Sequence, residues 1–505
     1  MTTNPPRPSL GAWANSLVVT LAVVVFLTGF ARTFNYAFRG NDDTVWLYLT
    51  GLELVHAGAA APLHDAVRTY LPTQPEGQQA LRRWNLRVSY TANYLLPSAL
   101  IYTASRVLKR IVDMFQGNYA LFVTLSLALG VVLSAVIAVS VLRWAILTCD
   151  NSAASFGTLL GLAVLAGLIV LPEEPPKNLV DTGGPLQSIR YLVQLFFVTG
   201  PEPSIFGYTP RSQFLLCALA VFLLRWHKYW MAAYILTILL SLLHQSMAGL
   251  LLLLLVTLDL IARPQIFDRK IVAIIVLGIV VMLGRERLFS TLGLWPAVAG
   301  IAIVVVAIGA AAAAHRYGKR LPWWETLDSR VLAPLRRRAD RLGSIGSDLA
   351  LASGLWLLTL PVALVVVRLV DPASAYHFWG EIHLRVLMLL QPAVFVGLSI
   401  LAIGWLEANL VIDRRWLYAT AVVVAVLATA PAAVQAVTHY DAGLLRTGRM
   451  LNQYNSLLGK SLPVLDTQTR EAALYYAIAI ELDSQANLVG PMLGSQWQWP
   501  APPRQ

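Results

Sequence analysis

The chain has 505 residues, of which 57% are hydrophobic and only 13% are charged. Soluble proteins have about twice that fraction of charged residues, so the composition excludes an ordinary soluble domain. The net charge is +11, but no aromatic residues alternate with the basic ones in the way that would indicate nucleic-acid binding. Two cysteines are too few for a disulfide framework.

Apolar runs near or above ~18 residues recur along the chain, and this is the length needed to cross a bilayer. Solid runs of this kind predict helices and not the alternating strands of a barrel. We therefore predict an all-α, polytopic transmembrane helical bundle. The expected spans are 13–30, 118–142, 154–171, 212–224, 229–244, 246–262, 270–284, 291–314, 350–370, 385–406 and 416–438. The run 212–224 is short, and we expect its helix to extend past Arg211 or Arg225.

Two further segments, 90–108 and 187–206, are apolar but contain polar residues and proline. If neither crosses the membrane there are eleven spans, and if both cross there are thirteen. If only one crosses, the N-terminal half inverts. We favour two crossings, because the basic run 106–110 would then anchor the first segment in the cytoplasm.

The distribution of charge orients the bundle. The segment 315–349 contains eight arginines and lysines against four acids, which predicts a cytoplasmic loop in contact with anionic lipid headgroups. The chain then divides into a bundle over 1–438 and a small extracytoplasmic helical tail over 439–505. Loop 31–89 is external and too long for a simple connection, which makes it a functional candidate.

The acidic pair Asp42 and Asp43 follows the first apolar run and precedes an amphipathic stretch. Ionised groups at the mouth of a span are costly against lipid, so we expect them to face a water-filled cleft on the extracytoplasmic side. A carboxylate there could act as a general base or hold a divalent cation. Alternatively, the two acids are solvated and cap the helix that begins near Thr44.

An apolar first span, an acidic pair and an aromatic-rich amphipathic stretch that ends near Gly58 resemble the start of the GT-C superfamily of polytopic membrane glycosyltransferases. The aromatic and proline residues at 94–97 and the turn at 243–246 add to the resemblance, which covers 13–262. It implies an enzyme that moves a sugar from a polyprenyl-phosphate-linked donor to an extracytoplasmic acceptor. Asp42 and Asp43 would supply the catalytic base or a metal ligand. The implied location is the bacterial inner membrane.

Three further residues are candidates for substrate binding. Arg211 could pair with the lipid phosphate, or extend along its span towards water. His244 could bind a phosphate or orient a carboxylate, or bond to backbone at a helix end. Glu202 lies in a proline-rich external turn and could present its carboxylate to the cleft, although turn chemistry explains it equally well.

The external loop 371–384 contains His377, Glu381 and His383. They could form a metal site if folded suitably, but their spacing matches no strong metal motif. A polar rim above the cleft, which helps to hold substrate, is the preferred interpretation, and an ordinary loop is the other alternative.

Two other classes of protein fit the same pattern. A transporter of lipid-linked substrates would also need charge within the membrane and a lateral groove. A non-catalytic scaffold of an envelope or pigment–protein complex would use the acids only to set topology. The sequence leaves the sugar, the acceptor and any need for a metal open.

Overall fold

The computed structural model describes residues 119–149, 151–168, 210–289, 328–369, 384–409 and 414–438, with isolated positions outside these ranges. Every regular element in these ranges is a helix, which confirms the all-α expectation for this part of the chain. The elements are α6 (Tyr119–Cys149), α7 (Ser152–Leu168), α9 (Pro210–Trp226), α10 (Trp230–Leu239), η3 (Leu240–Leu242), α11 (Gln245–Ala262), η4 (Pro264–Ile266), α12 (Arg269–Phe289), η6 (Asp328–Leu332), α15 (Ala333–Leu369), α17 (Leu384–Asn409) and α18 (Arg414–Thr438).

The helices occupy the positions that the apolar runs predict. Three contain segments long and apolar enough to cross a membrane: Val132–Cys149, Gln245–Ala262 and Arg385–Asn409. Shorter apolar helices cover Ala153–Ala166, Trp230–Leu242 and Ala419–Ala430. The expected spans 13–30 and 291–314, loop 31–89, the tail 439–505 and most of 90–108 and 187–206 lie outside the described residues.

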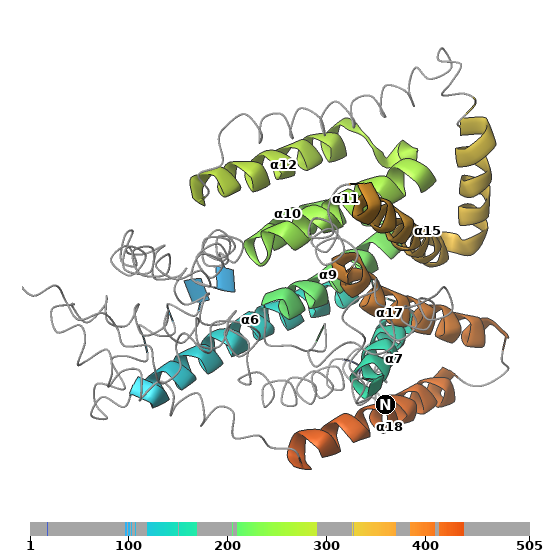
Figure 1. The fold of residues 1–505 in the computed structure, drawn as a ribbon. Helices are drawn as coiled ribbons and strands as arrows, with labels where there is room; N and C mark the ends of the chain where they lie inside the picture. Colours follow the sequence, from blue (N-terminus) through green and yellow to red (C-terminus); the bar gives the residue numbers. More distant parts are fainter. Residues whose placement is uncertain are drawn as a thin grey trace, which may run out of the picture.

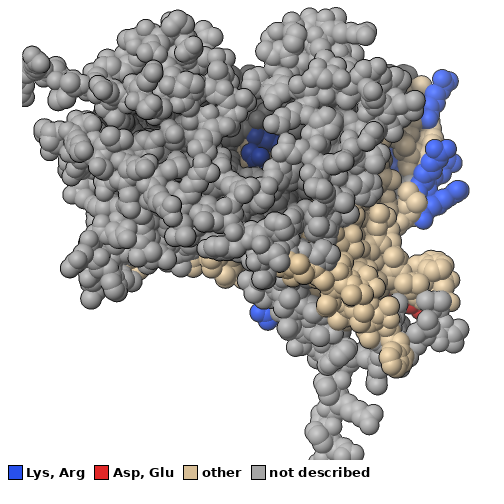
Figure 2. All heavy atoms as spheres, turned by 60° about the horizontal axis from the view of Figure 1, so that its bottom comes forward, with Lys and Arg blue, Asp and Glu red and all other residues tan. Residues whose placement is uncertain are grey.

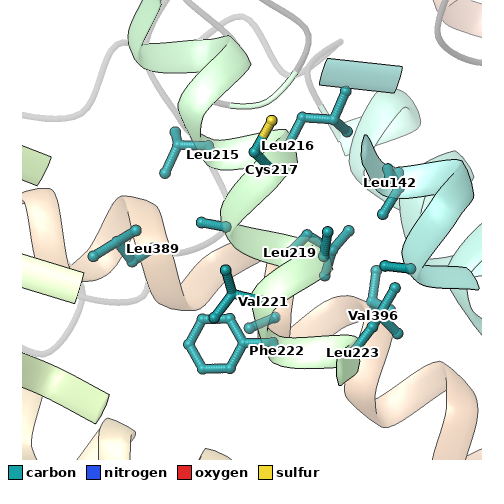
Figure 3. Close-up of a cluster of buried hydrophobic side chains, with 14 of the residues drawn as sticks. Leu142, Leu215, Leu216, Cys217, Leu219, Val221, Phe222, Leu223, Leu389 and Val396 are labelled. Atoms are coloured by element: carbon teal, nitrogen blue, oxygen red, sulfur yellow. The ribbon is translucent and has the colours of Figure 1, made fainter. Parts of the chain in front are cut away.

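Helix α9 lies at the centre of the bundle. Its expected extension in both directions is confirmed, and every side chain over 212–226 is buried. A helix that is apolar on all its faces must be enclosed on every side, and the burial of 212–224 meets this requirement. Figure 3 shows its leucines and Phe222 packed between Leu142 of α6 and Leu389 and Val396 of α17.

Helices α6 and α9 run in the same direction. Figure 1 shows them side by side, and the thiol of Cys149, at the end of α6, lies 3.7 Å from the carbonyl oxygen of Leu223, near the end of α9. Most of the apolar segment 187–206, which lies between them in the chain, is outside the described residues, so the counts of eleven and thirteen spans stay predictions.

The basic segment expected as a cytoplasmic loop is helical from residue 328. The helix continues into the predicted span 350–370 through a bend at Gly343, whose φ of 70° and ψ of −177° suit only glycine. Figure 1 shows the part of α15 before the bend standing across the direction of α10 and α12. We define 328–342 as the basic segment. Its many charges suggested a loop, but arginine is a good helix former.

Helices α7 and α17 approach each other through two glycines. A Cβ atom added to Gly157 would lie 2.6 Å from the Cα of Ile400, and one added to Gly161 would lie 2.6 Å from the Cα of Val396. The four-residue spacing of these glycines indicates close helix contact, and the structure shows that contact. The backbones leave no room for a methyl group.

Substitution of either glycine tests this contact. We expect Gly157→Ala and Gly161→Ala each to lower the free energy of unfolding by about 1–3 kcal/mol, because the helices must separate. Gly404→Ala is the matched control, since nothing lies within 4 Å of a Cβ there. Denaturant unfolding followed by circular dichroism measures all three. Equal stability of the Gly161 and Gly404 variants would contradict the close packing.

Candidate functional site

Buried polar side chains gather near the two ends of α11. At its start lies the His244 cluster, which we define as Arg211, His244, Ser246 and Arg385. At its end lies the Arg225 network, which we define as Arg225, Tyr234, Asp259, Arg263 and Asp348. Fifteen residues separate His244 from Asp259, or ~22 Å of helix at 1.5 Å per residue. We call the two sides of the bundle the His244 end and the Arg225 end.

The structure brings together two of the predicted site residues, Arg211 and His244. They come from α9 and from the turn before α11, and the positive charge of Arg211 disfavours a proton on the His244 ring. The other predicted site residues, which include both proposed catalytic acids, lie outside the described residues: Asp42, Asp43, Glu202, His377, Glu381 and His383. Their expected roles stay predictions.

His244 is the N-cap of α11. Its backbone is extended, with φ −154° and ψ 99°, and its Nδ1 accepts a long hydrogen bond, 3.5 Å, from the amide of Met247. The side chain is fully buried, and the ring packs edge-on against Phe214 of α9 with 6.1 Å between centroids. A buried ring that bonds to its own helix is closer to the structural alternative for His244 than to direct phosphate binding. In this interpretation, His244 positions the side chains around it.

Ser246 connects His244 to α17. Its Oγ lies 3.3 Å from Nδ1 of His244 and accepts a hydrogen bond of 2.9 Å from Nη1 of Arg385. Arg385 is only 7% exposed, whereas Arg211 is partly exposed. Arg211 and Arg385, which come from different helices, both lie close enough to His244 to act on the charge of its ring. This concentration of fixed positive charge is suited to an anion.

Burial lowers the pKa of His244 well below its ordinary value of 6.5, and the charges of Arg211 and Arg385 lower it further. A proton on the ring would be both poorly solvated and close to two cations. His244 is therefore neutral at physiological pH. With Nδ1 accepting from the Met247 amide, the remaining ring proton is on Nε2.

The lowered pKa predicts acid sensitivity. As the pH falls below about 6.5 the unfolded chain takes up a proton that the folded chain does not, so stability decreases. The wild type should lose up to about 1.4 kcal/mol of unfolding free energy per pH unit from this group. His244→Asn keeps an N-cap acceptor but does not titrate, so its stability should fall less between pH 7.5 and 5.5. The same pH dependence in both proteins, by chemical unfolding, would contradict the shift.

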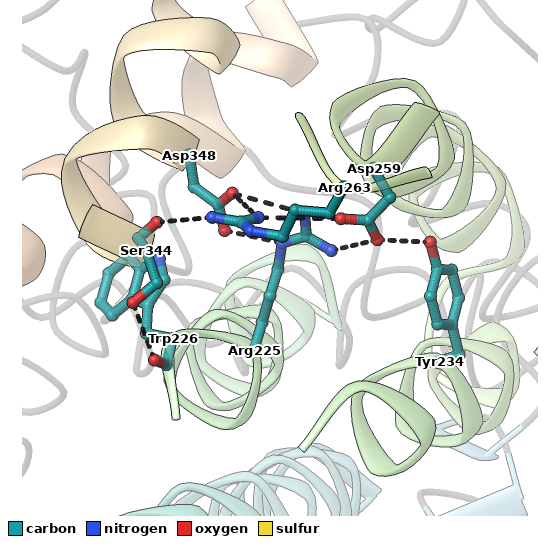
Figure 4. Close-up of polar contacts among 7 residues, drawn as sticks. All are labelled: Arg225, Trp226, Tyr234, Asp259, Arg263, Ser344 and Asp348. Atoms are coloured by element: carbon teal, nitrogen blue, oxygen red, sulfur yellow. Dashed lines mark hydrogen bonds and ion pairs between the residues drawn. The ribbon is translucent and has the colours of Figure 1, made fainter. Parts of the chain in front are cut away.

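The Arg225 network joins α9, α10, α11 and α15. Arg225 donates from Nη1 to Oδ2 of Asp259 at 2.5 Å and from Nε to Oδ2 of Asp348 at 2.6 Å. Tyr234 donates to Asp259 at 2.7 Å, and Arg263 donates to Asp348 at 2.7 Å. Figure 4 shows these five side chains converging from separate helices. Arg225 is 1% exposed and both carboxylates are fully buried.

The network satisfies its own charges. Two guanidiniums face two carboxylates, and the ring of Trp230 lies 5.2 Å from Arg225 and 5.1 Å from Arg263. The ring adds cation–π attraction to both guanidiniums. Every charge has an opposite partner at close range, which is what allows ionised groups to be buried. This arrangement indicates a structural role.

Removal of one charged partner should leave the other buried charges unpaired and so destabilise the fold. Arg225→Met leaves two buried carboxylates without their main counter-charge and should lower the free energy of unfolding by about 3–5 kcal/mol. Arg143→Met, the same change at an exposed position, should have little effect.

Tyr234→Phe gives a second measurement if the Arg225 variant does not fold. It removes one hydrogen bond to a charged group and should cost about 1.5–3 kcal/mol. Thermal unfolding of purified protein checks all of these variants. Wild-type stability in Tyr234→Phe would show that the network contributes nothing to the fold.

The sequence indicates where the polar residues of the two clusters lie, but not which of them pair with one another. Arg385 begins the predicted span 385–406, but nothing in its spacing linked it to Ser246, 139 positions away. Asp259 lies near the end of the predicted span 246–262, and Asp348 lies within the predicted loop 315–349. A signal existed in the rarity of acids within apolar runs, since a carboxylate there needs a partner.

Metal binding has no support among the described residues, which contain no group of three or more His, Cys, Asp or Glu side chains that could hold an ion. Asp42 and Asp43, which could hold a divalent cation, lie outside the described residues.

Comparison with known proteins gives no match to any family model, curated protein or solved structure. The function must therefore be argued from the site.

Proposed function

We propose that this protein is a polytopic membrane glycosyltransferase that moves a sugar from a polyprenyl-phosphate-linked donor to an extracytoplasmic acceptor. The observation that supports it is the His244 cluster, where Arg211 and Arg385 concentrate positive charge around a neutral imidazole. The phosphate of the donor would bind at Arg211, and Arg385 would add to the favourable potential from its fixed position.

A membrane environment is supported by the surface of the helices. Large apolar side chains are exposed in the middle of several helices, among them Leu253, Leu277, Leu358 and Leu427, each at least 60% exposed. Contact of these apolar side chains with water would be unfavourable, whereas contact with lipid tails would not be. The Arg225 end would face the cytoplasm, since exposed basic residues gather there. The His244 end would then face outward, on the side expected for Asp42 and Asp43.

The proposed reaction is a displacement at the anomeric carbon. The hydroxyl oxygen of the acceptor attacks this carbon, and its proton passes to Asp42 or Asp43. The bond between the anomeric carbon and the phosphate oxygen breaks, and the lipid phosphate leaves with the electron pair. Arg211 and Arg385 stabilise the charge that develops on the leaving group. His244 and Ser246 hold Arg385 in place.

A transporter of lipid-linked substrates is the second candidate, because it would use the same anion-binding charge. It would move the intact donor and break no bond. The two functions therefore differ in a measurable product, free polyprenyl phosphate.

The test uses purified protein in liposomes with polyprenyl-phosphate-linked radiolabelled sugars. Wild-type protein should release polyprenyl phosphate in the presence of a membrane acceptor extract. Asp42→Asn or Asp43→Asn should reduce release at least 100-fold, because general-base assistance contributes about 10²–10⁴. Arg211→Gln and Arg385→Gln should weaken donor binding, whereas Arg143→Gln, an exposed arginine on α6, should behave as wild type.

Two results would contradict the proposal. Full activity of both aspartate variants would remove the base, and unchanged donor binding in both arginine variants would remove the phosphate site. Translocation of intact donor without release of polyprenyl phosphate would favour the transporter.

A further inference from the structure

The Arg225 end carries a group of exposed arginines outside the Arg225 network. The basic segment (328–342) lies at the periphery of this end and presents four exposed arginines: Arg330, Arg337, Arg338 and Arg341. Figure 2 shows Lys and Arg side chains gathered along one edge of the described surface, on the side where the start of α15 lies in Figure 1.

The segment is anchored on its inner side. Arg336 donates from Nε to the carbonyl oxygen of Ile261 at the end of α11, at 3.0 Å. Ser344, just past the bend, donates to the carbonyl oxygen of Trp226, and Arg263 donates to the carbonyl oxygen of Ser344. These bonds fix which face of the helix is turned outward. The exposed arginines of the segment therefore lie on its outward face.

The outward face combines charge with apolar side chains. Arg337 and Arg341 are four residues apart and Arg338 and Arg341 three apart, so these three side chains are neighbours on one face. Leu335 and Leu342 are seven residues apart, adjoin this face and are 36% and 52% exposed. A helix with arginines beside exposed leucines is typical of one that lies in the interface of a membrane.

Exposed aromatic side chains indicate where along the bundle that interface lies. Every exposed aromatic residue among the described side chains lies at the Arg225 end: Trp144, Tyr229, Trp405 and Trp416. Trp and Tyr are enriched where lipid tails meet headgroups. The basic segment lies at this same end, and Figure 1 shows it standing across the direction of α10 and α12.

We propose that the basic segment binds anionic phospholipid headgroups of the adjacent leaflet. Arg337, Arg338 and Arg341 contact the phosphates, while Leu335 and Leu342 insert between the first carbons of the tails. The proposal depends on charge complementarity and depth, and it is independent of any glycosyltransferase activity.

Native mass spectrometry of the detergent-purified full chain tests this surface, with phosphatidylglycerol and phosphatidylcholine of the same acyl chains as probes. The wild type should bind phosphatidylglycerol more tightly, and sodium chloride should weaken that binding. Arg337→Gln, Arg338→Gln and Arg341→Gln together should weaken it about 100-fold, at about fivefold per charge. The matched triple Lys variant should stay within about fivefold of wild type.

The outcomes separate charge from fold. Should the triple Gln variant misfold, Arg338→Gln alone should still lose about fivefold. Equal binding of the two lipids by wild type, or an equal loss in the Gln and Lys triples, would overturn the proposal. Binding of soluble polyglutamate in place of phosphatidylglycerol, with the same dependence on the three arginines, would overturn it in favour of an acidic protein partner.

Discussion

The burial of Arg225 is the constraint on which the rest of the described bundle depends. A guanidinium group cannot be left unpaired among apolar helices, and it cannot lose its proton in a protein. Asp259 and Asp348 must therefore lie where it can reach both, and this fixes the ends of α9 and α11 and the entry of α15. Because α9 is buried on every side, the position of its last turn is transmitted to the helices packed around it.

The two polar clusters differ in the way that structural and binding charges differ. In the Arg225 network each guanidinium faces a carboxylate, and the donors are used within the protein. In the His244 cluster two guanidiniums lie close enough to an imidazole to lower its pKa further than burial alone does. The first arrangement stabilises a fold, whereas the second is the one that we propose for binding an anion. This contrast is the physical reason for placing the proposed site at the start of α11.

The sequence predicted the helices well and their contacts poorly. Apolar length alone located α11 and α17, because uninterrupted apolar runs of this length are typical of helices that cross a bilayer. The spacing of Gly157 and Gly161 is typical of close helix contact, but it is a weak signal in a span rich in glycine and alanine. The pairing of Arg225 with Asp348 could not be foreseen, because it joins residues 123 positions apart and depends on the bend at Gly343.

The candidate site was predictable only in part. Arg211 and His244 were chosen for their chemistry near helix ends, and the structure places them together. The burial of His244 was not predictable, because the local sequence does not decide whether a histidine at a helix end is exposed or buried. The number of spans was not predictable, because the apolar segments 90–108 and 187–206 both contain polar residues and proline. Periodicity and length do not decide whether such segments cross.

The balance of charge in the Arg225 network has a consequence for how the protein experiences membrane voltage. A unit charge moved through 100 mV changes energy by ~2.3 kcal/mol, so an unbalanced arginine that moved within the field of a membrane would couple the fold to that field. Two positive and two negative groups held within hydrogen-bonding distance cancel this coupling. Polarisation or depolarisation of the cell should leave this part of the bundle undisturbed.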